Sequence, residues 1–280
     1  MDSLVSTAWL EAELGAPDLR VVDATLFLPG MGREARAEHA VAHLPGAVYF
    51  DIDEIADSDS PYPHMLPPAH KFASRMQSLG IGDGTRVVVY DNSPLHSAAR
   101  AWWMLKAFGA HYAAILDGGM QKWTAEGRPT ESGAHPHRHG HFTALLDEQE
   151  VADKAFVRSL IGGDSHVIAD ARAPQRFAGE APEPRAGLAS GHIPGSRSLP
   201  QSEFFHADNS FKQGEELRAA FAGAGVDLAK PLVATCGSGV TAAVILFGAH
   251  LLGKEDVRLY DGSWSEWGAD PDTPKATGAA

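Results

Sequence analysis

Short apolar runs separated by longer segments of helix-forming residues recur along the first half of the chain. Leu19 to Ala24, Arg86 to Tyr90 and Ala113 to Leu116 are brief runs rich in valine, leucine, isoleucine or alanine. Runs of this length and composition are typical of strands buried on both faces of a parallel sheet. Ser97 to Phe108 carries helix-forming residues between the last two runs, and this pattern predicts a helix there.

The second half of the chain alternates in the same way. Val167 to Ala169, Leu232 to Thr235 and Val257 to Tyr260 are the predicted strands, and Val240 to Leu252 is the predicted helix between the last two. Strand and helix signals that alternate favour the α/β class, because parallel strands need helical crossovers. We therefore expect mainly parallel sheets that are flanked by helices.

Four sequence motifs occur twice, in the same order and about 145 residues apart, which is the signature of an internal repeat. We therefore expect two tandem copies of one domain, over residues 1–130 and 150–280, joined by a linker over residues 131–149. The repeated motifs are Val22-Asp23-Ala24 with Ala169-Asp170-Ala171, His43-Leu44-Pro45-Gly46 with His192-Ile193-Pro194-Gly195, Gly80 to Asp91 with Gly225 to Cys236, and Leu116 to Trp123 with Tyr260 to Trp267.

The net charge and the cysteine count exclude several classes of partner and site. The 280-residue chain carries a net charge of −13 at pH 7, and nucleic-acid-binding domains carry a basic excess, so no nucleic-acid partner is expected. The single cysteine excludes an intramolecular disulfide, a Cys-rich zinc site and an iron–sulfur cluster. No stretch approaches the ~18 apolar residues that span a bilayer, and Met1 to Leu10 lacks a signal-peptide pattern. These features favour a cytoplasmic protein with a reduced thiol and no membrane partner.

The cysteine stands at the end of a predicted strand, directly before a glycine-containing loop and a predicted helix. Ligand sites of open α/β sheets lie at the carboxyl ends of the strands. Glycines let the loop curl so that consecutive N–H groups form an anion nest, and the helix N-terminus adds positive potential. This setting stabilises a thiolate, the nucleophilic form of cysteine. The alternative is that the cysteine is a small buried hydrophobic residue. The predicted nucleophile is Cys236, and the predicted anion loop is Gly237, Ser238, Gly239, Val240 and Thr241.

The first repeat offers an internal comparison for this loop. Asp91 occupies the position equivalent to Cys236, and Pro94, three residues later, removes a backbone donor. The first domain is therefore predicted to be catalytically silent.

A cysteine phosphatase is the first alternative chemistry for such a loop. Phosphatases of this kind need an arginine six residues after the cysteine to clamp the phosphate. Ala242 stands at that position and the loop carries no charge, which argues against phosphoryl transfer.

Together, the paired His-x-Pro-Gly motifs, the Cys-Gly-Ser-Gly-Val-Thr loop and the Tyr-Asp-Gly-Ser-Trp-x-Glu-Trp segment resemble the tandem-domain rhodanese family of sulfurtransferases. The resemblance implies two rhodanese-like domains and sulfur transfer through a persulfide on Cys236. Thiosulfate-using members resemble Cys-Arg-Lys-Gly-Val-Thr at the loop, whereas Gly237 and Ser238 resemble the branch that uses 3-mercaptopyruvate. The neutral loop agrees, because it offers thiosulfate no cation.

This branch implies transfer of the sulfur of 3-mercaptopyruvate to cyanide or an acceptor thiol, such as thioredoxin or a small dithiol, with release of pyruvate. It implies no metal or organic cofactor. Two alternatives stay open: a thiosulfate:cyanide sulfurtransferase, and a non-catalytic persulfide carrier or binding module.

The resemblance also assigns substrate-binding residues. Arg176 and Arg185 match the family's substrate-binding arginine pair in spacing, and a guanidinium suits a carboxylate beside a keto oxygen. The alternative for each is a solvated surface arginine. Arg172 is expected to be structural and to pair with a carboxylate.

A proton relay is the third feature that the resemblance implies, formed by Ser238, His64 and Asp53. Its expected role is proton transfer, with the carboxylate orienting the imidazole. His64 could instead be a capping or buried hydrogen-bonded histidine, and Asp53 could be a helix N-cap. Asp51 is the competitor for the role of Asp53.

Four histidines alternate in the linker, a pattern that can bind a divalent metal. No cysteine or carboxylate joins them, so no physiological metal is expected there. These residues are His135, His137, His139 and His141.

Overall fold

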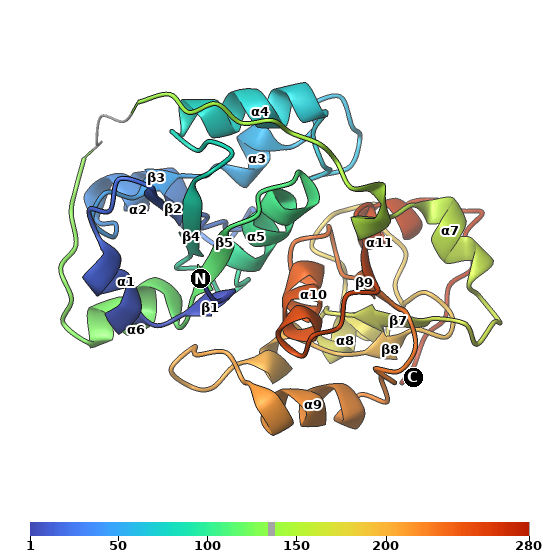
Figure 1. Cartoon of the computed structure of the whole chain (residues 1–280). Coiled ribbons are helices and arrows are strands. Elements are labelled where there is room, and N and C mark those ends of the chain that lie inside the picture. Colours follow the sequence, from blue (N-terminus) through green and yellow to red (C-terminus); the bar gives the residue numbers. More distant parts are fainter. Residues whose placement is uncertain (134–137, 280) are drawn as a thin grey trace. The chain divides into compact units, whose positions relative to one another are not determined.

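The computed structural model describes residues 1–133 and 138–279, which form two compact units. Among the described residues, unit one comprises residues 1–58, 66–133, 138–147 and 206–211, and unit two comprises residues 59–65, 148–205 and 212–279. Figure 1 shows the helices and strands of both units. Each unit thus holds one repeat of the sequence together with a short segment from the other half. Of the alternating linker histidines, His135 and His137 lie outside the described residues.

Both units contain a five-stranded, all-parallel sheet with the same strand order. The order is β1-β5-β4-β2-β3 in unit one and β6-β10-β9-β7-β8 in unit two, so each strand has a counterpart. The predicted parallel sheets and the internal duplication are therefore confirmed. The strands are β1 (Leu4–Val5), β2 (Leu19–Asp23), β3 (Val48–Tyr49), β4 (Arg86–Tyr90), β5 (Ala113–Leu116), β6 (Val151–Ala152), β7 (Val167–Asp170), β8 (Arg197–Ser198), β9 (Leu232–Thr235) and β10 (Val257–Tyr260).

Helices connect the strands in both units, and among those the structure describes none is long and apolar enough to cross a membrane. Short 3-10 segments cover Glu148–Glu150 and Gln201–Phe204. The α-helices are α1 (Thr7–Glu13), α2 (Ala35–Val41), α3 (Ile52–Ile55), α4 (Ala69–Ser78), α5 (Ala98–Ala107), α6 (Gly119–Ala125), α7 (Lys154–Ser159), α8 (Pro174–Phe177), α9 (Gly214–Gly223), α10 (Ala242–Leu251) and α11 (Ser263–Trp267).

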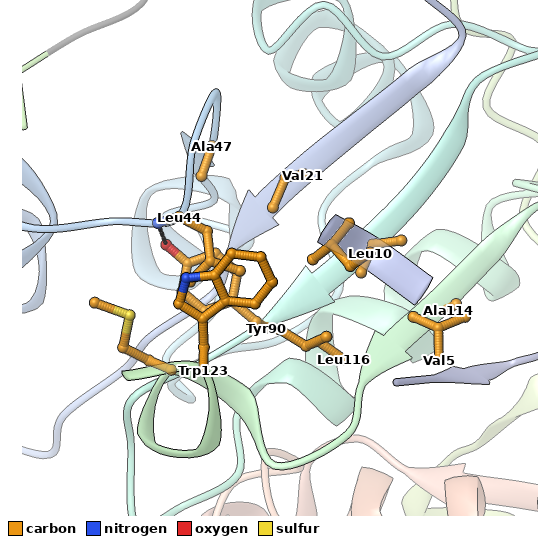
Figure 2. Packing of buried hydrophobic residues seen from close by; sticks show 11 residues of the cluster. Val5, Leu10, Val21, Leu44, Ala47, Tyr90, Ala114, Leu116 and Trp123 are labelled. Atoms are coloured by element: carbon orange, nitrogen blue, oxygen red, sulfur yellow. Dashed lines mark hydrogen bonds between the residues drawn. The ribbon is translucent and has the colours of Figure 1, made fainter. Parts of the chain in front are cut away.

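One face of the first sheet carries a core that α1 and α6 cover. Side chains of a strand alternate between the two faces, and Val88 and Tyr90 of β4 belong to this core. Leu10 of α1 and Trp123 of α6 pack on the same cluster, as Figure 2 shows. The Tyr90 hydroxyl accepts a hydrogen bond from the backbone N–H of Leu44 at 3.2 Å, so the buried phenol has a partner.

The second sheet repeats this arrangement with α7 and α11. Ile168 of β7, Val233 of β9 and Tyr260 of β10 form one buried cluster with Val157 and Trp264 from those helices. α10 packs on β9 and β10, as α5 packs on β4 and β5. Strand, loop and crossover helix therefore follow the same path in both units, so the loop after β9 can be compared with the loop after β4.

The two His-x-Pro-Gly motifs form equivalent turns. In each turn a proline is followed by a glycine with positive φ, 72° at Gly46 and 81° at Gly195, as a type II turn requires. Both histidines are buried. The His192 ring stacks on the Phe177 ring with centroids 3.8 Å apart, and its Nδ1 atom forms a hydrogen bond with the Phe177 carbonyl. The two motifs therefore have a structural role in each unit.

Candidate active site

Cys236 follows β9 directly and precedes α10, at the carboxyl end of the second sheet. Its side chain is buried, with 2% of the residue exposed. Thr235, the last residue of β9, pairs with Asp170, the last residue of β7. The loop thus begins between neighbouring parallel strands, where ligands of α/β sheets bind.

Backbone contacts from α11 hold the carbonyls of this loop. The N–H of Trp264 donates to the Cys236 carbonyl at 2.9 Å. The Gly237 carbonyl accepts two hydrogen bonds from Ser265, from its N–H at 2.9 Å and from its hydroxyl at 2.7 Å. With both carbonyls held, this part of the loop has a fixed orientation.

The loop N–H groups divide into two sets. Those of Cys236 and Gly239 donate to the Ser263 hydroxyl oxygen, each at 3.1 Å. Within residues 1–133 and 138–279, no protein acceptor takes the N–H groups of Ser238, Val240 and Thr241. The second set is free to stabilise an anionic group, as the sequence predicts for a nest at a helix N-terminus.

Arg176 lies against the cysteine loop. A Cβ atom built on Gly237 would lie 3.0 Å from the Nη2 atom of Arg176, so glycine leaves the space that the guanidinium uses. The same Nη2 donates to the Glu183 carboxylate at 2.5 Å. A guanidinium beside the loop provides the positive charge that the loop itself lacks.

A buried ion-pair network orients this arginine. Glu183 also accepts from Arg172 at 2.8 Å, and Arg172 in turn pairs with Asp170 at 2.7 Å. The side chains of Arg172, Asp170 and Glu183 are at most 2% exposed. Low exposure and reciprocal hydrogen bonds hold the side chains of such a network in one orientation. The expectation that Arg172 pairs with a carboxylate is confirmed.

Arg185 is half-buried and lies two residues after Glu183 in the same unit.

His64 and Ser238 are in contact within unit two. The Nδ1 atom of His64 lies 2.9 Å from the Ser238 hydroxyl oxygen, and both residues are buried. The backbone of His64 has a φ of 64°, a region that non-glycine residues seldom occupy and that recurs at functional sites. The structure thus brings together two members of the predicted relay.

The carboxylates named for the relay belong to unit one and sit at the start of α3. Asp51 is the helix N-cap, since its side chain accepts from the Glu54 N–H at 3.1 Å, and it also pairs with Arg36 at 2.8 Å. The alternative that Asp53 is the N-cap is therefore wrong, because Asp53 lies in the first turn and is exposed. Asp51 thus already has two partners within unit one.

The equivalent loop of unit one contains a carboxyl group at the position of the cysteine. The carboxylate of Asp91 accepts from the N–H groups of Ser93 at 2.9 Å and Ala98 at 2.7 Å. Burial, with a smaller effect from the nearby Asp23, raises the pKa of Asp91 to about 7 against these two backbone hydrogen bonds. A side chain committed in this way leaves the loop no reactive group.

Asp91 is expected to make folding stability depend on pH. A carboxyl whose pKa is higher in the folded than in the unfolded chain favours folding at low pH, and this advantage is lost as pH rises through about 7. The free energy of unfolding should fall by roughly 2 kcal/mol between pH 5 and 8. Asp91→Asn, which cannot ionise, should flatten this slope in chemical denaturation series. Equal slopes for both proteins would contradict the assignment.

No group of three or more potential ligands gathers into a metal site in the part of the chain that the structure describes. The site is instead a thiol, a set of available N–H groups, an ion-paired arginine and a serine–histidine contact.

The model of the rhodanese-like domain matches this chain twice, over residues 6–126 and 153–270. The chain belongs to the rhodanese family. Two curated relatives in this family are equally similar to it: the 3-mercaptopyruvate sulfurtransferase of Rattus norvegicus and the thiosulfate sulfurtransferase of Bos taurus, each 45% identical with 95% of this chain and 91% of the relative covered. The crystal structure of the 3-mercaptopyruvate sulfotransferase SseA from Escherichia coli has a TM-score of 0.86 and 38% identity, covering 95% of this chain and 100% of that one.

Overall identity therefore shows the rhodanese family and leaves the sulfur donor to be argued from the site. At the loop, Gly237 leaves room for Arg176 and no loop residue is charged.

Sequence reasoning missed three residues of the site: Glu183, Ser263 and Ser265. The signal for Ser263 was present in the repeat, where Gly119 of the first copy is aligned with a serine of the second. Glu183 lies between the two predicted substrate arginines in the sequence. Its contacts depend on the conformation of a loop, which no periodic pattern in the sequence reveals.

Proposed function

We propose that this rhodanese-family protein is a 3-mercaptopyruvate sulfurtransferase with Cys236 as its nucleophile. The observation that carries the proposal is the neutral cysteine loop with available N–H groups beside the ion-paired guanidinium of Arg176. Relatives with this activity in their names, 41 to 45% identical to the chain, support the same assignment. The first domain, with Asp91 at the equivalent position, is proposed to be catalytically silent.

The first half-reaction forms a persulfide. The Cys236 thiolate attacks the sulfur of 3-mercaptopyruvate, a sulfur–sulfur bond forms, and the carbon–sulfur bond breaks. The electron pair of the broken bond goes to carbon, so pyruvate leaves as its enolate and gains a proton. Available N–H groups of Ser238, Val240 and Thr241 would stabilise the developing negative charge, which is the electrostatic part of catalysis.

Arginines hold the substrate in this proposal. Arg176, oriented by Glu183, binds the carboxylate and keto oxygens, and Arg185 is proposed to bind them from the same loop. The buried network behind Arg176 lowers the entropy cost of placing the guanidinium, because the side chain is already held in one orientation.

Proton transfer is assigned to Ser238, His64 and Asp53. The 2.9 Å contact between Ser238 and His64 supports the first step of such a relay. Asp53 is included in the relay because the family resemblance implies it.

The second half-reaction returns the thiolate. An acceptor thiol, such as thioredoxin or a small dithiol, or cyanide in an assay, attacks the outer sulfur and releases Cys236, which makes the cycle ping-pong. Since the chain has one cysteine, no second thiol of this chain can resolve the persulfide. A reducing compartment such as the cytoplasm suits this chemistry, and the reaction needs no metal or organic cofactor.

Donor preference tests the proposal directly. We expect kcat/KM with cyanide as acceptor to be at least about tenfold higher for 3-mercaptopyruvate than for thiosulfate. The loop carries no cation of its own for a dianion, and the Arg176 guanidinium beside it is already paired with Glu183. Thiocyanate release would be measured in parallel with both donors, and pyruvate release with 3-mercaptopyruvate. The equally similar bovine thiosulfate sulfurtransferase makes thiosulfate the second candidate donor, and a preference for it would overturn the assignment. Absence of turnover with either donor would favour a persulfide carrier.

A further inference from the structure

We propose that Ser263 is a positioning residue that holds the cysteine loop in its reactive form. This inference rests on the proposed function for the role of the loop, and on hydrogen bonds and backbone geometry for the role of the serine. Ser263 begins α11 and is fully buried. It would act through Cys236 and Gly239 and would not touch the substrate.

The Ser263 hydroxyl uses its full hydrogen-bonding capacity on the loop and its support. Its oxygen accepts from the N–H groups of Cys236 and Gly239 at 3.1 Å, and its proton goes to the Tyr260 carbonyl at 2.8 Å. A hydroxyl has one donor and two acceptor positions, so these three bonds fill them, and the Thr235 hydroxyl, which also donates to this oxygen at 3.4 Å, competes for an acceptor position. By accepting from two loop N–H groups, Ser263 fixes the conformation of the loop. In this conformation the N–H groups of Ser238, Val240 and Thr241 remain available.

The backbone of Ser263 carries a conformational cost. Its φ is 49°, and within the described chain only three other non-glycine residues, His64, His96 and Asn209, have positive φ. Such values are unfavourable for a residue with a Cβ and persist where the surrounding structure imposes them, often at functional sites. Unit one has Gly119 at this position, with φ 55°, and glycine adopts this conformation without steric cost.

The two units hold their loops through different N–H groups. In unit one, Asp91 supplies the acceptor for loop N–H groups from its own side chain. Cys236 cannot do so, because its thiol must remain free to react. The N–H group of Ser238, the counterpart of Ser93, thus stays available in unit two, while Ser263 accepts from the N–H groups of Cys236 and Gly239 at the cost of a strained backbone.

Two substitutions separate the hydroxyl from the backbone strain. Ser263→Gly removes the hydroxyl and relieves the strain, whereas Ser263→Ala removes the hydroxyl and keeps the strain. Asn209→Gly, which alters a positive-φ residue in unit one, is the matched control. For each protein we would measure the melting temperature, kcat/KM with 3-mercaptopyruvate, and the rate at which iodoacetamide alkylates Cys236 as a function of pH.

We expect both Ser263 variants to lose about tenfold or more in kcat/KM and to show a changed pH profile of alkylation, because the loop N–H groups lose their acceptor. Ser263→Gly should melt at a higher temperature than Ser263→Ala, and Asn209→Gly should keep wild-type activity. If Ser263→Gly keeps activity and alkylation within about threefold of the wild type, the serine is only a turn residue and the proposal is overturned. The alkylation profile does not depend on the sulfur donor, so a changed profile in a protein that rejects 3-mercaptopyruvate would refute the proposed function and support the positioning role.

Discussion

Cys236→Ser is expected to lower the rate of pyruvate release from 3-mercaptopyruvate by about 10⁴-fold or more, because a serine hydroxyl is a weak nucleophile at neutral pH and cannot form a persulfide. The substitution exchanges one atom in a buried residue whose backbone N–H and carbonyl stay bonded to Ser263 and Trp264. The fold should therefore persist.

The measurement is steady-state pyruvate release with cyanide as acceptor, alongside a circular-dichroism melt of each protein. Asp91→Ser is the matched control, since it alters the equivalent position of the first repeat. It should retain most of the activity. Pyruvate release that persists in Cys236→Ser would show that the reaction takes another route and that Cys236 is not the nucleophile.

Arg176→Ala is expected to lower kcat/KM for 3-mercaptopyruvate by about 10- to 100-fold, the range that loss of a charge-assisted hydrogen bond gives. Arg176→Lys should recover only part of the loss, because an ammonium keeps the charge but lacks the planar fork. Without Arg176, Glu183 still pairs with Arg172 at 2.8 Å, so the buried carboxylate keeps a cation and the fold should be retained.

Arg197→Ala provides the control for Arg176, since Arg197 is an exposed arginine of the same unit in β8. It should leave kcat/KM unchanged. If Arg176→Ala changed KM and kcat no more than Arg197→Ala does, the guanidinium would have no part in holding the substrate. An equal loss with thiosulfate and with 3-mercaptopyruvate would indicate that Arg176 supports the loop and does not select the carboxylate.

The sequence predicted the long strands, the duplication and the cysteine loop because each leaves a local pattern. The runs at β4 and β9 are uninterrupted and apolar, and the loop follows its strand directly. Strands β1, β3, β6 and β8 escaped prediction, since two residues are too few to show a period.

The residues that hold the site were harder to predict. Glu183 and Ser263 act through tertiary contacts with residues 7 to 28 positions away. Spacing along the chain reveals helix faces and strand alternation, but it cannot show which side chains of a loop return to one point. The internal repeat is the exception, because a serine in place of Gly119 marks a difference between the two loops in the sequence itself.

The central claim is that Cys236 carries the transferred sulfur, and mass spectrometry of the intact protein tests it most directly. After incubation with 3-mercaptopyruvate without acceptor, the mass should increase by one sulfur, peptide mapping should locate it on Cys236, and cyanide should remove it. An unchanged mass in a protein that still releases pyruvate, or a sulfur retained after cyanide is added, would contradict the account.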